Sequence, residues 1–222
     1  MSEFDKDSFI QTCLLHIPFD GWTEQALASA CAESGLASDA WQHEFPGGVE
    51  DVFICYADWA DRNMVDAFDR WYEQQTADNT SGPVPVHLQI KQLIMLRLQQ
   101  AQPYREAVRK SLAYLSRPQT ASLAPQLLYR TVDAMWRAAG DHSTDYNFYT
   151  KRASLSAVYS STLLAFLSDD SEELEKTEAF LDRRLKDISR IPKMSAPFRN
   201  AASGVFSGLR RTAEMMMARR QR

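Results

Sequence analysis

Several features that mark other classes of protein are missing from this sequence of 222 residues. No apolar stretch approaches the roughly 18 residues that a transmembrane helix needs. Glycine is scarce, with eight residues, and β-branched residues seldom occur in runs, which favours helices over strands. The three cysteines, Cys13, Cys31 and Cys55, lie in apolar helical contexts, and their odd number predicts buried free thiols in a reducing compartment.

The common catalytic motifs are missing as well. There is no Glu-x-x-His pair for a metal, no glycine-rich phosphate loop and no Gly-x-Ser-x-Gly elbow. The four histidines are far apart; we expect His43 at the surface, and His142 either solvated or paired with a neighbouring aspartate. The sequence therefore predicts no catalytic residue, no metal and no cofactor, although an enzyme of unknown chemistry stays open.

Positive charge is almost missing from the N-terminal part and gathers at the other end. Residues 1–61 hold twelve acidic residues and one basic residue, a net charge of −11, whereas residues 181–222 carry a net +8. This polarity suggests that the two ends face different partners. The acidic start, MSEFDKDSFIQ, lacks an apolar signal region and an Arg- and Ser-rich import character, so we expect a cytoplasmic, bacterial protein.

The N-terminal part has the layout of a helix-turn-helix. Apolar spacing predicts four helices. The first spans 5–17, the second begins at a Thr23 cap, the third is short and capped by Ser38, and the fourth spans 49–72. This order resembles the DNA-binding part of tetracycline-repressor-type regulators. The third helix, however, lies in SDAWQHEF, without Lys or Arg, and phosphate contacts need positive charge. We therefore expect the shape without nucleic-acid binding.

The body is predicted to be helical over 86–101, 104–115, 127–139 and 145–167. The segment SRPQTASLAP connects the second and third of these helices, Gly140 ends the third, and Ser143 or Thr144 caps the fourth. A further helix is expected to begin in the acidic run DDSEE after Ser168, with those acids in a solvated first turn.

An aromatic cluster opens the helix over 145–167. It consists of Tyr146, Phe148 and Tyr149, beside the charged Asp141, Asp145, Lys151 and Arg152. Aromatic side chains ringed by charges are typical of a protein-docking patch. The alternative is an aromatic core with a solvated hinge.

The C-terminal tail combines an apolar stripe with basic residues. The stripe includes Phe198, Val205, Phe206, Leu209 and Met216, and Arg210 and Arg211 lie mainly off it. Such a pattern fits an interfacial helix that lies on a membrane. The alternative is a last helix that packs on the body or on the second copy of a homodimer.

One long motif resembles a known family. It is carried by Trp136, Ala139-Gly140-Asp141, Ser143-Thr144-Asp145, Asn147, Tyr149-Thr150-Lys151-Arg152 and Phe180-Leu181-Asp182-Arg183-Arg184. This pattern is similar to the signature region of the coenzyme Q biosynthesis protein nine family. Phe148 departs from it, because the family has Trp there, so an aromatic ring is kept and its N–H donor is lost.

The resemblance implies an all-α, tetracycline-repressor-like helical bundle with a C-terminal amphipathic helix. The expected parts are a helix-turn-helix-like part (1–75), a helical lipid-binding body (76–192) and the amphipathic helix (193–222). The family consists of non-catalytic, lipid-binding accessory proteins of ubiquinone biosynthesis. They bind isoprenoid quinone intermediates or phospholipid at the membrane and present the quinones to the demethoxyubiquinone hydroxylase, which here implies a peripheral protein of the bacterial inner membrane.

The resemblance also implies three sets of residues. Partner binding is expected at Met135, Trp136, Asp145, Phe148, Tyr149 and Arg152. Lipid binding is expected at Leu93, Leu112, Leu128, Val132, Leu155, Tyr159 and Leu163, which lie on helices that could line an apolar cavity. The tail residues named above are the expected membrane contacts. The alternative function is a ligand-responsive transcriptional regulator of the tetracycline-repressor type.

Overall fold

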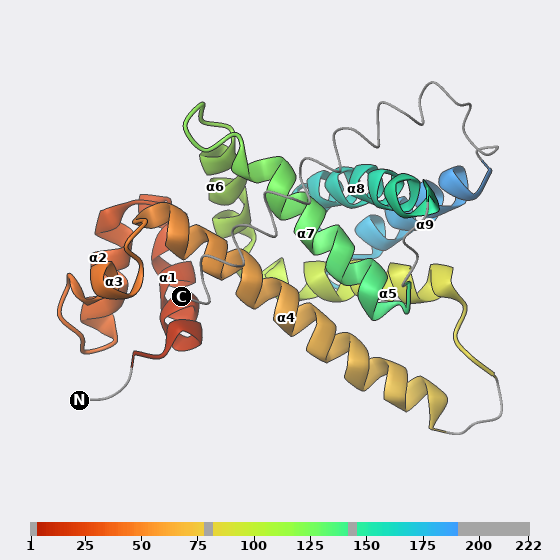
Figure 1. Cartoon of the computed structure of the whole chain (residues 1–222), viewed down its shortest axis with the longest axis horizontal. Helices are drawn as coiled ribbons and strands as arrows, with labels where there is room; N and C mark the ends of the chain where they lie inside the picture. The colour runs from red at the N-terminus through yellow and green to blue at the C-terminus, as the bar shows by residue number, and fades with distance from the viewer. Residues whose placement is uncertain (1–3, 78–81, 142–145, 191–222) are drawn as a thin grey trace. The chain divides into compact units, whose positions relative to one another are not determined.

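The computed structural model describes residues 4–77, 82–141 and 146–190, and these residues form helices, turns and loops but no strand. The helices are α1 (Lys6–Asp20), α2 (Glu24–Glu33), α3 (Ala40–Glu44), α4 (Val49–Thr76), α5 (Val86–Ala101), α6 (Arg105–Leu115), α7 (Leu123–Ala138), α8 (Tyr146–Leu167) and α9 (Glu175–Arg190), with a short 3-10 turn, η1 (Gln102–Tyr104), before α6 (Figure 1). The predicted all-α class is confirmed, and α5 has the predicted bounds.

Local sequence explains where the first helices begin. The Asp5 carboxylate caps α1 by accepting from the amides of Asp7 and Ser8, and Thr23 caps α2 as predicted, by accepting from the amide of Ala26. The predicted Ser38 cap on α3 is wrong. α3 is preceded by Asp39 without a side-chain cap, because a turn in which the Ala40 amide donates to the Ala37 carbonyl leads into it.

The connector between α6 and α7 is shorter than the predicted segment SRPQTASLAP. α7 begins at Leu123, so Pro125 lies in its first turn rather than in the connector. Proline is tolerated there because the amide it lacks would have no partner within the helix. At the other end, Gly140 ends the helix as predicted, with φ at 78° and the Asp141 amide donating to the Trp136 carbonyl.

The start of α9 corrects a second prediction. The acidic run after Ser168 does not begin the helix, which starts at Glu175, and Asp169 is buried rather than solvated. Its carboxylate accepts from the Ser171 amide at 2.9 Å and from the amide and hydroxyl of Thr177 at 2.7 and 2.5 Å. Leu174 is fully buried and lies just before α9. Its backbone φ is 62°, a value that is rare for residues other than glycine.

The helices divide into two compact units. Of the described residues, the first unit holds 4–62 and 100–124, and the second holds those of 63–99 and 125–190. These units cut across the predicted parts, because residues 100–124 go with the N-terminal helices. The predicted division into parts at residues 75 and 192 stays a prediction.

The first unit has an aromatic core. Trp22 packs edge-on against Phe53, lies 5.3 Å from Tyr56 between ring centroids, and donates from Nε1 to the Ser111 hydroxyl at 3.0 Å. The three cysteines are buried and free, as predicted, and burial raises the pKa of the Cys13 thiol. This unit is therefore held together mainly by apolar and aromatic contacts.

The second unit contains the part of α4 from Asn63 onward together with most of α5, α7, α8 and α9. Its buried side chains include Phe68, Leu93, Val132, Leu155, Phe166 and Leu181. Lys91 on α5 joins α9 through ion pairs to Glu178 and Asp182 at 2.8 and 2.7 Å. Within the described ranges, no helix has the length and the apolar character needed to cross a bilayer.

Candidate functional site: a buried arginine between α7 and α8

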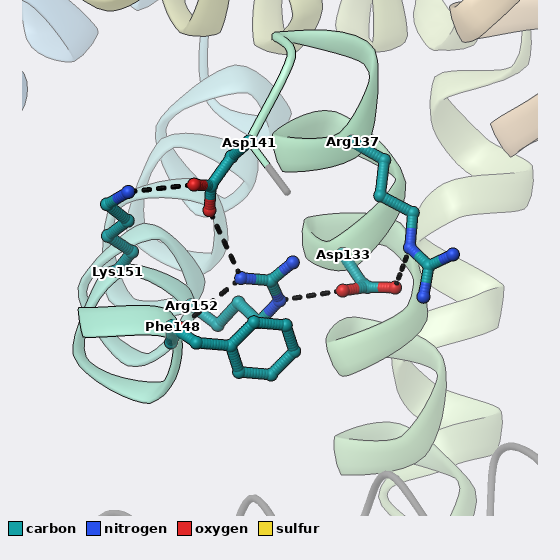
Figure 2. A network of polar contacts seen from close by, with 6 residues as sticks. All are labelled: Asp133, Arg137, Asp141, Phe148, Lys151 and Arg152. Atoms are coloured by element: carbon teal, nitrogen blue, oxygen red, sulfur yellow. Dashed lines mark hydrogen bonds and ion pairs between the residues drawn. The ribbon is translucent and has the colours of Figure 1, made fainter. Parts of the chain in front are cut away.

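Arg152 on α8 is the largest fully buried side chain of the second unit, with an exposed fraction of 1%. Its Nε donates to the Asp133 carboxylate on α7 at 2.6 Å, and its Nη1 lies 3.4 Å from the Asp141 carboxylate just after α7 (Figure 2). A buried charge is tolerated only where it is paired and hydrogen-bonded. Both carboxylates come from the α7 side, so Arg152 ties the start of α8 to the end of α7.

Phe148 completes the surroundings of this guanidinium. The Arg152 carbon Cζ lies 3.4 Å from the centroid of the Phe148 ring, and Nη1 donates to the Phe148 carbonyl at 3.3 Å. Stacking of a guanidinium on an aromatic face is favourable, more so where water is excluded. Phe148 in turn meets Tyr149 edge-on, with ring centroids 5.1 Å apart. Arg152 therefore fixes the position of the aromatic residues at the start of α8.

Two outer cations extend the network on opposite sides of Arg152. Arg137 donates from Nε to the second oxygen of Asp133 at 2.6 Å, and Lys151 donates from Nζ to Asp141 at 2.8 Å (Figure 2). The same Lys151 nitrogen lies 5.4 Å from the centroid of the Trp136 ring. Each carboxylate is thus shared between the buried arginine and one outer cation.

The predicted partner-binding residues have different degrees of burial. Met135, Phe148 and Arg152 are buried, and Trp136 and Tyr149 are half-buried. Asp145 lies outside the described residues. Arg152, Phe148 and Tyr149 are brought together, and Trp136 joins them through Lys151. The role of this set in docking stays a prediction.

The predicted lipid-binding residues do not all fall in one unit. In the second unit, Leu93, Val132, Leu155 and Tyr159 are buried, and Leu128 and Leu163 are half-buried. Leu112 is half-buried in the first unit. The predicted membrane contacts from Phe198 to Met216 lie outside the described residues.

Sequence reasoning missed Asp133 and Arg137. They stand four residues apart on α7, a spacing that brings opposite charges together on one helix face and so could have revealed them. The sequence also gave no direct sign that Arg152 is buried while Lys151, the preceding residue, is partly exposed.

No group of three or more His, Cys, Asp or Glu side chains in the described part of the chain is placed to hold a metal ion. α3 carries no Lys or Arg, its Glu44 pairs with Lys6 at 3.3 Å, and His43 is exposed, as predicted. This helix presents no positive charge of its own to a DNA backbone.

Comparison with known proteins finds similarity to one family. The COQ9 family model matches residues 121–192, which include α7, α8, α9 and every residue of the Arg152 network. The chain is 28% identical to the ubiquinone biosynthesis protein COQ9, mitochondrial, of Rattus norvegicus, over 90% of this chain and 64% of the relative. The Homo sapiens protein is 27% identical over 90% of this chain and 62% of its own length. The chain thus spans less than two thirds of these relatives.

A solved structure supports the fold. The TetR transcriptional regulator from Nitrosomonas europaea superimposes with a TM-score of 0.64 over 84% of this chain and 98% of its own, at 18% identity. Similarity at that level concerns the fold alone, and it confirms the predicted tetracycline-repressor-like bundle. Together with the family match over residues 121–192 and the relatives aligned along most of the chain, it confirms the similarity to the COQ9 family that the motif around Trp136 and Arg152 indicated.

Proposed function

We propose that this protein is a non-catalytic accessory protein of ubiquinone biosynthesis, which binds isoprenoid quinone intermediates and presents them to the demethoxyubiquinone hydroxylase. The observation that carries the proposal is the Arg152 network, which lies wholly inside the segment matched by the COQ9 family. The relatives aligned over most of the chain are named as ubiquinone biosynthesis proteins, which supports the pathway.

In this proposal Arg152 acts as a positioning residue for a docking surface. By tying α8 to Asp133 and Asp141, it holds Phe148 and Tyr149 in one arrangement before a partner arrives. A surface that is already ordered loses less conformational entropy on binding. Half-buried aromatic residues such as Tyr149 and Trp136 are the residue types that anchor protein interfaces.

The lipid would be held in the second unit, among the apolar side chains of α5, α7 and α8. Leu93, Val132 and Leu155 supply such side chains from these three helices. A prenyl chain there would keep its apolar surface out of water. We further propose that the basic tail holds the protein peripherally at an inner membrane, because each Lys or Arg near an anionic surface contributes about 1 kcal/mol.

The test uses the purified full chain and two readouts. Native mass spectrometry with lipid extraction should reveal a bound isoprenoid quinone or phospholipid. The mass of the intact protein in the same spectrum distinguishes a monomer from a homodimer. Pull-down with the hydroxylase should be lost in Phe148→Ala/Tyr149→Ala and kept in Phe180→Ala, a half-buried aromatic on α9. Circular dichroism must show that both variants are folded. Unchanged pull-down by the folded double variant contradicts the docking assignment.

A transcriptional regulator is the second candidate, and the TetR-like fold is the observation that favours it. Residues 1–61 carry a net charge of −11, which repels a duplex. The expectation is therefore no binding to DNA at physiological salt, in a gel-shift titration with genomic fragments. Tight, sequence-selective binding would replace the proposal above.

A further inference from the structure

The two outer cations of the Arg152 network are exposed yet fixed in place. The Arg137 side chain is 70% exposed and the Lys151 side chain 38% exposed, whereas the carboxylates that hold them, Asp133 and Asp141, are only 13% and 9% exposed. Exposed Lys and Arg side chains ordinarily sample many rotamers and lose that freedom on binding. Here the buried Arg152 fixes both carboxylates, and each carboxylate fixes one cation at the surface.

The network has an excess of positive charge on its solvent side. Three cations share two carboxylates, and both carboxylates are more buried than the outer cations. The bond to Asp133 uses the Nε of Arg137, one of the five N–H donors of a guanidinium. The charge and the outward donors are therefore suited to a partner that brings carboxylates.

Trp136 adds an aromatic element to these cations. It precedes Arg137 on α7, its ring is half-buried, and the Lys151 nitrogen lies over it. Its indole Nε1 is shielded from solvent and has no hydrogen-bond partner within the described residues. A buried donor without a partner costs about 1–3 kcal/mol, so an acceptor supplied from outside would relieve that cost.

We propose that Trp136, Arg137 and Lys151 form a cationic anchor that receives an acidic segment, rich in Asp or Glu, of the protein partner. This inference rests on the proposed function, which makes that partner the hydroxylase. Fixed cations on either side of a buried arginine match carboxylates at defined positions. Two cations fixed beside one half-buried tryptophan form a small patch, which suits carboxylates at defined positions on a protein better than an extended layer of lipid phosphates.

The experiment measures association with the purified hydroxylase by surface plasmon resonance over a series of salt concentrations. The variant is Arg137→Gln/Lys151→Gln, and the matched control is Lys176→Gln/Arg183→Gln, which removes two exposed positive charges from α9 of the same unit. We expect the variant to associate about tenfold more slowly at low salt and to lose most of the salt dependence, since peripheral charges act mainly on association. The control should stay within about twofold of the wild type.

Trp136→Phe sharpens the result, because it keeps an aromatic ring and removes the Nε1 donor. We expect faster dissociation in this variant with little change in salt dependence, because a short-range hydrogen bond from a neutral donor contributes to complex lifetime rather than to steering. Urea midpoints for all three variants establish that they are folded.

The outcomes separate this inference from the proposed function. If wild type binds the hydroxylase and the Arg137/Lys151 variant behaves like its control, the anchor is wrong while the proposed function stands. If wild type shows no binding, both fall. Loss of binding to phosphatidylglycerol vesicles, or of self-association, with hydroxylase binding unchanged would also overturn the anchor and assign these cations to a membrane or to a second copy.

Discussion

Two cations in the second unit each pair with two carboxylates, but their surroundings differ. Arg152 is shared by Asp133 and Asp141, and Lys91 is shared by Glu178 and Asp182. The arginine is 1% exposed and its carboxylates 13% and 9%, whereas the lysine is 23% exposed and its carboxylates 47% and 54%. The difference shows that the number of ion pairs says little about their importance until burial is known.

Burial also separates structural roles. Lys91 joins α5 to α9 in a place where water can replace either carboxylate. Around Arg152 water has little access and cannot replace a lost partner. Removing Arg152, Asp133 or Asp141 therefore leaves the remaining charges poorly solvated. The buried network therefore fixes one geometry for the end of α7 and the start of α8, and the exposed one adds a weaker link between two helices that already belong to the same unit.

The largest expected effect is that of Arg152→Ala. The substitution leaves Asp133 and Asp141 facing each other across a cavity at low exposure, and breaking a buried pair in this way costs about 3–5 kcal/mol. Urea unfolding followed by circular dichroism measures the loss. Arg152→Lys should recover only part of it, because an ammonium cannot reproduce the fork that reaches both carboxylates and stacks on Phe148. A loss below about 1 kcal/mol would remove the distinction from Lys91.

A buried anion, Asp169, allows the comparison to be made with the opposite charge. It is 2% exposed and is paired with neutral donors from Ser171 and Thr177. Burial raises its pKa, but the hydrogen bonds from Ser171 and Thr177 outweigh that effect and hold the pKa well below its usual range. The folded protein thus binds a proton at this carboxyl less readily than the unfolded chain does.

We expect Asp169→Asn to destabilise the protein by about 2 kcal/mol at neutral pH, since hydrogen bonds to a charged acceptor are the stronger kind. A lowered folded-state pKa stabilises the protein above the unfolded value of about 3.9, and that contribution is lost as the pH falls toward the folded value. The difference between wild type and variant should therefore be constant from pH 7 to about 5 and shrink below about 4. Urea midpoints across this range measure it, and a constant difference down to pH 3 would contradict the assignment.

The sequence predicted the helical framework well because its signals are local. The Thr23 cap, the Gly140 terminator and the bounds of α5 depend on residues within a turn or two of each other. The two buried charges depend on tertiary packing. Lys151 and Arg152 point about 100° apart on α8, and only the position of α7 decides which of them faces inward.

The start of α9 was missed for a related reason. An acidic run after a serine is typical of a solvated first turn, and the sequence gave no sign that Asp169 would fold back onto Thr177. That contact goes with a positive φ at Leu174, which pattern reasoning does not expect of a leucine. The candidate site was located through its aromatic residues and family motif, whereas the pairing of Arg152 with Asp133, nineteen residues away, became visible only in three dimensions.

The smallest expected effect is that of Lys91→Met, which removes the less buried of the two cations and keeps most of its apolar stem. Exposed ion pairs contribute about 0.2–1 kcal/mol, so the stability should fall by less than about 1 kcal/mol despite the loss of two ion pairs. Salt screens exposed charges more than buried ones, so 1 M sodium chloride should erase most of this difference and leave that of Arg152→Ala nearly intact. Urea midpoints at low and high salt for the two variants test this directly. If both variants responded to salt alike, burial could not be the property that separates the two networks, and the positioning role given to Arg152 would lose its physical basis.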